Sequence, residues 1–196
     1  MLKLYRAPFS TNVERVALAL AYKGLAAESV WIEYAERSPV EQVSGQPLVP
    51  VLVDGDEVVV DSMRIVRFLE DKQPEPALYP AERARREELL VFIDWFNSVW
   101  KVWPNAIEAG RDIEANAAAM RGSLDRFEAL LDGREHLMGD DFSAADIAAF
   151  PFLKFALFRE PEDDEPFHLI LEEHLPLAAH PRLADWARRV NERPRA

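Results

Sequence analysis

The sequence predicts a fold in two parts, a small α/β domain over residues 1–78 and an all-helical domain over residues 84–196. Strand-like and helix-like patterns alternate through the first 70 residues, and no strand pattern follows them. Between the two parts lies "KQPEPALYPAE", which holds three prolines and opens the linker expected over residues 72–83.

The first half begins with a strand, a helix and a second strand. Residues 2–6 alternate apolar and polar side chains, which is typical of a strand. From Thr11 onward apolar residues recur at helical spacing, and Gly24 stands where that helix should end. Residues 28–33 are expected to form the second strand.

A hairpin and a helix complete the α/β domain. "VPVLVDGDEVVVDS" holds two β-branched runs around Asp54-Gly55, which predicts a hairpin. Asp61 then starts a helix with an apolar stripe. The order βαβ, irregular segment, ββα indicates a small sheet layered against helices.

The second half reads as helices throughout. Residues 84–109 are expected to form a long helix kinked by Pro104, and residues 112–132 a second helix that ends at Gly133. "FSAADIAAF" begins a third, because Ser143 and Asp146 have capping-box spacing. Two shorter helical segments follow, around an acidic, proline-containing stretch.

Composition narrows the classes of function. The chain has 196 residues, of which 49% are hydrophobic and 30% charged, the balance of a soluble globular protein. Its net charge of −12 argues against nucleic acid and anionic membranes as partners. The absence of cysteine excludes disulfides and thiolate metal sites, and the four histidines lack metal-ligand spacing, so no metal is expected. With no signal-peptide pattern or bilayer-length apolar run, we expect a cytoplasmic protein.

Two adjacent hydroxyl residues stand at the start of the first helix. Thr11 and Glu14 have capping-box spacing, so Thr11 is predicted to cap the helix and to leave the Ser10 hydroxyl beside its positive end. The alternative is that Ser10 is a polar turn residue or is itself the cap.

The motifs together resemble the glutathione S-transferase family, in its serine-type form with a zeta- or omega-like active-site motif. The resemblance rests on "LYRAPFSTNVERVALALAYKG", "VPVLVDGD" and "VVDSMRIVRFLED", which occur in the order and spacing of that family, and on "LMGDDFSAADIAAFP" in the second half. It implies a thioredoxin-like N-terminal domain, glutathione as co-substrate, a hydrophobic small-molecule electrophile and a homodimer.

On this resemblance Ser10 is the catalytic residue, because serine-type members bind the glutathione sulfur with a hydroxyl there, where omega-type members have cysteine. Moving a thiol pKa from about 8.5 to about 6.5 needs roughly 2.7 kcal/mol. One hydrogen bond to a charged group contributes about 1.5–3 kcal/mol and a helix N-terminus roughly 0.3–2 kcal/mol. Ser10 and the helix start would therefore suffice.

The resemblance also implies the residues that bind the tripeptide. Base rates favour a trans bond between Val49 and Pro50, whereas the family has a cis-proline there that turns the preceding residue toward the cysteinyl backbone. Asp61 is expected to cap its helix and to face the γ-glutamyl ammonium, and the Ser62 hydroxyl and amide to bind the carboxylate.

One position departs from the family pattern. Pro47-Leu48 stands where a polar pair often precedes Val-Pro, so Leu48 brings no polar side chain to the glycine end of the thiol. Gln46 is the candidate to replace that contact.

The aromatic residues suggest a core and a pocket. Phe92, Trp95 and Phe96 are expected in the core or at a dimer contact, and Phe9, Trp100 and Trp103 are assigned to the electrophile pocket. The predicted function is transformation of a hydrophobic electrophile with glutathione. The alternative is a thiol-binding or regulatory protein of the same fold without catalysis.

Overall fold

The computed structural model describes residues 1–33 and 35–196. The chain divides into two compact units, residues 1–78 with 194–196, and residues 79–193. The last three residues therefore pack with the first unit, which the sequence did not indicate.

The first unit is built on a four-stranded mixed sheet in the order β2-β1-β3-β4. β1 (Leu2–Arg6) pairs in parallel with β2 (Ala27–Trp31), and β3 (Val51–Asp54) pairs antiparallel with β1 and with β4 (Glu57–Val60). The predicted hairpin is confirmed, with Val51 opposite Val60 and Gly55 at a φ of 61° in its turn.

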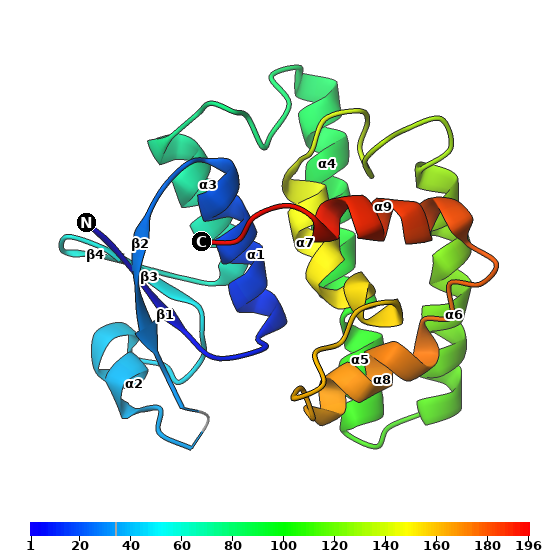
Figure 1. Ribbon diagram of the computed structural model, residues 1–196, viewed down its shortest axis with the longest axis horizontal. Helices are drawn as coiled ribbons and strands as arrows, with labels where there is room; N and C mark the ends of the chain where they lie inside the picture. Colours follow the sequence, from blue (N-terminus) through cyan, green and yellow to red (C-terminus); the bar gives the residue numbers. More distant parts are fainter. Residues whose placement is uncertain (34) are drawn as a thin grey trace. The chain divides into compact units, whose positions relative to one another are not determined.

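Helices cover both faces of this sheet (Figure 1). α1 (Thr11–Tyr22) and α3 (Ser62–Lys72) pack side by side on one face. α2 (Ser38–Ser44) lies against the other, where Val40 packs with Ile32 and Val51 in a small apolar cluster. The sequence predicted no helix here, because α2 has seven residues and buries only Val40, too little for an apolar periodicity.

The expected long helix of the second unit is interrupted before its proline. α4 (Arg83–Trp95) runs into a π-helical turn, η1 (Phe96–Trp100), and α5 (Val102–Glu108) follows. Pro104 lies in the first turn of α5, where the missing N–H is not needed. The π-helical turn is closed by the Lys101 N–H, which donates to the Phe96 carbonyl at 3.0 Å. The helix is therefore irregular upstream of the kink that the sequence predicted at Pro104.

The remaining helices follow the predicted order. They are α6 (Ile113–Leu130), α7 (Ala144–Leu153), the short 3-10 turn η2 (Lys154–Ala156), α8 (Pro166–His174) and α9 (Pro181–Asn191). The capping box at the start of α7 is confirmed.

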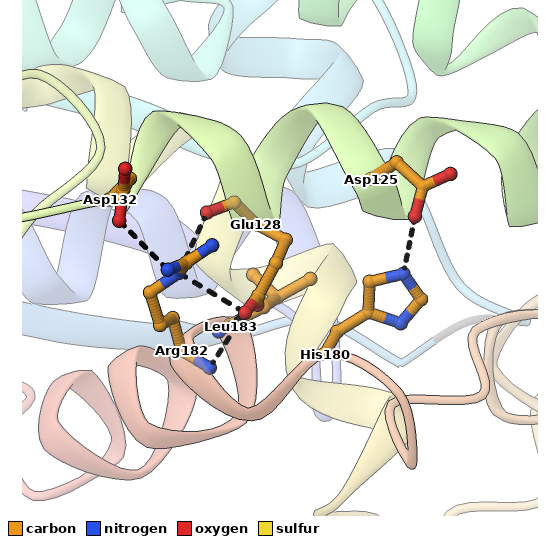
Figure 2. Close-up of polar contacts among 6 residues, drawn as sticks. All are labelled: Asp125, Glu128, Asp132, His180, Arg182 and Leu183. Atoms are coloured by element: carbon orange, nitrogen blue, oxygen red, sulfur yellow. Dashed lines mark hydrogen bonds and ion pairs between the residues drawn. The ribbon is translucent and has the colours of Figure 1, made fainter.

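α9 takes its cap from another helix (Figure 2). His180 at its start makes no side-chain cap bond, and the Glu128 carboxylate of α6 instead accepts the backbone N–H groups of Arg182 at 3.2 Å and Leu183 at 2.9 Å. The Arg182 guanidinium in turn donates a hydrogen bond to the Asp132 carboxylate at 2.8 Å. A carboxylate distant in sequence thus satisfies amides that no local residue satisfies.

Within the described ranges, no helix has the length and apolar character needed to cross a membrane.

Candidate functional site

Ser10 is the N-cap of α1. Its hydroxyl oxygen accepts the backbone N–H of Val13 at 3.4 Å, and its backbone φ of −61° and ψ of 115° are extended, as an N-cap requires. The prediction that Thr11 caps this helix is therefore wrong, and the alternative that Ser10 is itself the cap is correct. Thr11 is buried and is already the first residue of the helix, so it does not occupy the cap position.

The Ser10 hydroxyl keeps its own proton available. A hydroxyl accepts through its lone pairs and donates through its single hydrogen. Ser10 is half-buried, and among residues 1–33 and 35–196 no acceptor receives that hydrogen. The same residue can therefore cap α1 and donate one further hydrogen bond.

Two strained backbone positions adjoin the starts of α1 and α3. Phe9, next to Ser10, has a φ of 57° and a side chain that is 39% exposed. Asp61 has a φ of 74°. Left-handed backbone is uncommon for non-glycine residues and costs about 1–3 kcal/mol, a cost that concentrates at functional sites.

Asp61 caps α3 with one carboxylate oxygen. Its Oδ1 accepts the N–H groups of Met63 and Arg64, both at 3.0 Å, as the sequence predicted. Its Oδ2 accepts no hydrogen bond from the described residues, and the side chain is exposed. This oxygen is available to a cationic group.

Ser62 is more constrained than the sequence indicated. The residue is buried, its Oγ accepts from the Arg15 guanidinium at 3.3 Å, and it donates to Asn12 Oδ1 over a long 3.4 Å. Burial lowers the pKa of Arg15 to about 9, with the Asp61 carboxylate acting in the opposite direction, so the guanidinium is charged at neutral pH. Sequence reasoning missed Arg15 and Asn12, although an arginine within the apolar run "RVALALA" was a usable signal.

The segment before β3 has the expected cis bond. The Val49-Pro50 peptide is cis, as the resemblance implied and base rates did not. Leu48 is exposed. The Gln46 amide is used within its own loop: it donates to the Leu48 carbonyl at 2.8 Å and to Ser44 Oγ at 3.1 Å, and accepts from the Leu48 N–H at 2.8 Å.

The aromatic residues of the second unit divide between core and surface. Trp100 is 0% exposed, its ring stacks on Phe96 at 4.6 Å, and its indole N–H donates to Ser123 at 2.9 Å. The expectation that Trp100 lines a pocket is corrected, because no part of its ring reaches the surface. Trp103 is half-buried and packs edge-on against Trp95.

The second unit also contains an open pocket of about 670 Å³. Phe92 and Trp95 form its aromatic wall, and Arg126, Asp132 and Arg134 lie around it. Phe92 and Trp95, expected in the core or at a dimer contact, thus face a cavity on one side.

The fold and the site together define a class of protein. A βαβ-ββα sheet with a cis-proline before β3, joined to an all-helical unit, is the architecture of a thioredoxin-like domain with a helical partner domain. Residues 4–77 match the family model of the glutathione S-transferase N-terminal domain, and residues 89–189 match that of the C-terminal domain. The chain belongs to the glutathione S-transferase family and is an enzyme of the glutathione transferase class.

Individual relatives agree with this assignment. Glutathione S-transferase Z1 of Arabidopsis thaliana is 28% identical over 181 residues, covering 85% of this chain and 82% of its own. Glutathione S-transferase 3 of Zea mays is 32% identical over 165 residues, covering 74% of this chain and 73% of its own. A crystal structure of a glutathione S-transferase from Rhodospirillum rubrum is 28% identical with a TM-score of 0.78, covering 99% of this chain and 89% of that one.

Proposed function

We propose that this enzyme joins glutathione to a hydrophobic electrophile, with the Ser10 hydroxyl donating a hydrogen bond that stabilises the thiolate. The observation that carries this proposal is the uncommitted hydrogen of Ser10 at the start of α1, where the hydroxyl oxygen already accepts from Val13. A thiolate sulfur placed there would receive both the hydroxyl hydrogen bond and the field of the helix N-terminus.

The two contributions are large enough for the chemistry. A hydrogen bond to a charged group stabilises it by about 1.5–3 kcal/mol, and a helix N-terminus by roughly 0.3–2 kcal/mol. Their sum of roughly 1.8–5 kcal/mol corresponds to about 1.3–3.7 pKa units, which brings a thiol of pKa about 8.5 to neutral pH. Serine does not itself need to lose its proton, so no neighbouring general base is required.

The start of α3 would bind the γ-glutamyl end of the peptide. The free Oδ2 of Asp61 suits the ammonium, and the backbone N–H of Ser62, at the positive end of α3, suits the carboxylate. Val49, before the cis-proline, is proposed to pair with the cysteinyl backbone. Phe9 is proposed to contact the electrophile, and the active form is proposed to be a homodimer.

The test is to remove the Ser10 hydroxyl while leaving the helix cap nearly intact. Glycine costs only a few tenths of a kcal/mol at an N-cap, so Ser10→Gly should preserve folding. We expect the pKa of bound glutathione, followed by the ultraviolet absorbance of the thiolate, to rise by about 1–2 units. Turnover of a chromogenic electrophile at pH 7 should fall by about ten- to a hundredfold.

Thr11→Ala is the matched control, because Thr11 neighbours Ser10 but makes no cap bond. It should leave both the thiol pKa and turnover unchanged. An unchanged pKa in Ser10→Gly would overturn the assignment of Ser10. Tight binding of glutathione with no turnover of any electrophile in the unmodified protein would instead favour a non-catalytic thiol-binding protein.

A further inference from the structure

Arg15 is an unusual residue for the interior of a small α/β unit. It lies in the second turn of α1, and its side chain is only 1% exposed. Burial of a charged group is costly unless hydrogen bonds and opposite charge compensate it. The compensation here comes from the starts of both helices: Asn12 accepts from the guanidinium at 3.3 Å, Ser62 accepts at 3.3 Å, and the Asp61 carboxylate lies close enough to act on its charge.

The direction of these hydrogen bonds has a chemical consequence. A guanidinium only donates, so the Ser62 oxygen must accept from Arg15 and cannot donate to it. The Ser62 hydrogen is thereby forced toward another acceptor, which in the free protein is Asn12 Oδ1 at 3.4 Å. That distance is long for a hydroxyl donor, whose usual range is about 2.5–3.0 Å. A better acceptor, such as a carboxylate, would take the hydrogen from Asn12.

We infer that Arg15 is a positioning residue of the thiol site, which turns the Ser62 hydroxyl toward the carboxylate of the γ-glutamyl end and holds the starts of α1 and α3 together. This inference rests on the proposed binding of a γ-glutamyl thiol. Arg15 acts through Ser62 and does not itself touch the peptide. Arg15 belongs to the helix that Ser10 caps, and it contacts the first residue of the helix that Asp61 caps.

The opposite ends of the same two helices offer a control. Lys23, at the C-terminal end of α1, has a fully buried side chain that forms an ion pair with Glu70 of α3 and donates to the carbonyl of Pro74 at 3.1 Å. Glu70 lies eight residues after Ser62, or about 12 Å along the helix. A change at Glu70 therefore loosens the α1–α3 pair without touching the predicted thiol site.

The experiment measures glutathione affinity by calorimetry in Arg15→Gln, Arg15→Lys and Glu70→Gln, alongside urea unfolding. Glutamine can accept a hydrogen bond from Ser62, so Arg15→Gln should release the hydroxyl from its orientation and weaken affinity by about tenfold. Arg15→Lys remains a donor and should recover most of the affinity. Glu70→Gln should lower stability and leave affinity unchanged. In steady-state kinetics the Arg15→Gln effect should fall on KM for glutathione more than on kcat, because Ser10 is intact.

A double mutant separates positioning from general loosening. If Arg15 acts through Ser62, Arg15→Gln with Ser62→Ala should bind no more weakly than Ser62→Ala alone. Additive losses, equal losses in Glu70→Gln, or full affinity in Arg15→Gln would each overturn the inference while leaving Ser10 untouched. An unmodified protein that binds no glutathione would overturn the proposed function and this inference together.

Discussion

α1 and α7 are each capped at the N-terminus by a serine, and the two serines use their hydroxyls differently. At the start of α7 the Ser143 hydroxyl accepts from Ala145 N–H at 3.3 Å and donates to Asp146 at 3.0 Å. At the start of α1 the Ser10 hydroxyl accepts from Val13 N–H, and its hydrogen has no acceptor among the described residues. Ser143 uses its acceptor and its donor within the fold, whereas the donor of Ser10 is unused among the described residues.

The difference also appears in the carboxylate that follows each cap, three residues after Ser143 and four residues after Ser10. Asp146 is 0% exposed and binds the Ser143 N–H at 2.9 Å, the Leu137 N–H at 3.0 Å and the Trp186 indole at 2.8 Å. The acid in the first turn of α1, Glu14, does not complete a capping box and instead forms an ion pair with Arg195 at 2.9 Å. The start of α7 is thus a buried structural joint, whereas at the start of α1 the acid stands one residue too far from the cap and the Ser10 hydroxyl hydrogen has no acceptor among the described residues.

The largest expected effect lies at the structural joint. Asp146→Ala leaves several buried donors without an acceptor, each costing about 1–3 kcal/mol, so unfolding free energy should fall by at least about 3 kcal/mol. Urea denaturation measures this loss, and exposed Asp141→Ala is the control, expected within about 0.5 kcal/mol of the parent. Comparable losses in the two variants would show that the buried contacts of Asp146 do not stabilise the start of α7.

A third helix start tests whether a cap from a distant residue matters as much as a local one. Glu128→Ala removes the acceptor of two α9 amides, and we expect a loss of about 1–3 kcal/mol in urea unfolding. Asp125→Ala, which breaks only an exposed contact to His180, should cost about 0–1 kcal/mol (Figure 2). Equal costs would mean that the cross-helix cap adds nothing beyond a surface pair.

Alanine at the two serines compares them directly. Both variants lose an N-cap, so each should lose about 0.5–2 kcal/mol of unfolding free energy. Only Ser10→Ala should also reduce conjugation at pH 7, and Ser143→Ala should retain the parent rate at temperatures where it is folded. A matching rate loss in Ser143→Ala would show that the two hydroxyls do not differ in function.

A smaller effect is expected at Thr11. Thr11→Val keeps the shape of the side chain and removes the hydroxyl, which makes no hydrogen bond with the described residues. Thermal unfolding should therefore change by less than about 0.5 kcal/mol. A loss in the usual range for a cap would reinstate Thr11 as the cap of α1.

The fold was predictable because its patterns are local. The hairpin around Asp54-Gly55 and the capping box at Ser143 each need only a few consecutive residues, and both are confirmed. Sequence reasoning failed where distant residues determine the outcome. The sequence predicted that Trp100 lines a pocket, but its ring stacks on Phe96 and its indole N–H donates to Ser123, both within the core.

The candidate site shows the same division. The cap at Asp61 follows from its neighbours, and its geometry is confirmed. The contact between Arg15 and Ser62 joins residues 47 positions apart, so no local pattern could indicate it. The choice between Ser10 and Thr11 as cap depended on a shift of one residue in the helix start, which is within the ordinary uncertainty of sequence-based boundaries.

The smallest expected effect concerns the glycine end of the thiol, where Gln46 extends the comparison. Like Ser143, the Gln46 amide is committed within the fold, because its donors bind Leu48 and Ser44. Leu48 brings no polar side chain, so neither Leu48 nor the Gln46 amide offers a spare side-chain donor for a glycine carboxylate. We therefore expect glutathione and γ-glutamylcysteine to bind with affinities within about threefold of each other in calorimetric titrations, since a single lost charge-assisted bond would cost roughly ten- to a hundredfold.

Gln46→Ala sharpens this last prediction. If Gln46 only braces its loop, the variant should weaken both thiols equally through the changed Leu48 backbone, and their affinity ratio should stay the same. If Gln46 releases Leu48 and turns to the glycine carboxylate on binding, the parent should prefer the full tripeptide by about tenfold or more, and the variant should lose that preference. The ratio of the two affinities, rather than either affinity alone, therefore distinguishes a side chain held within the fold from one available to the ligand.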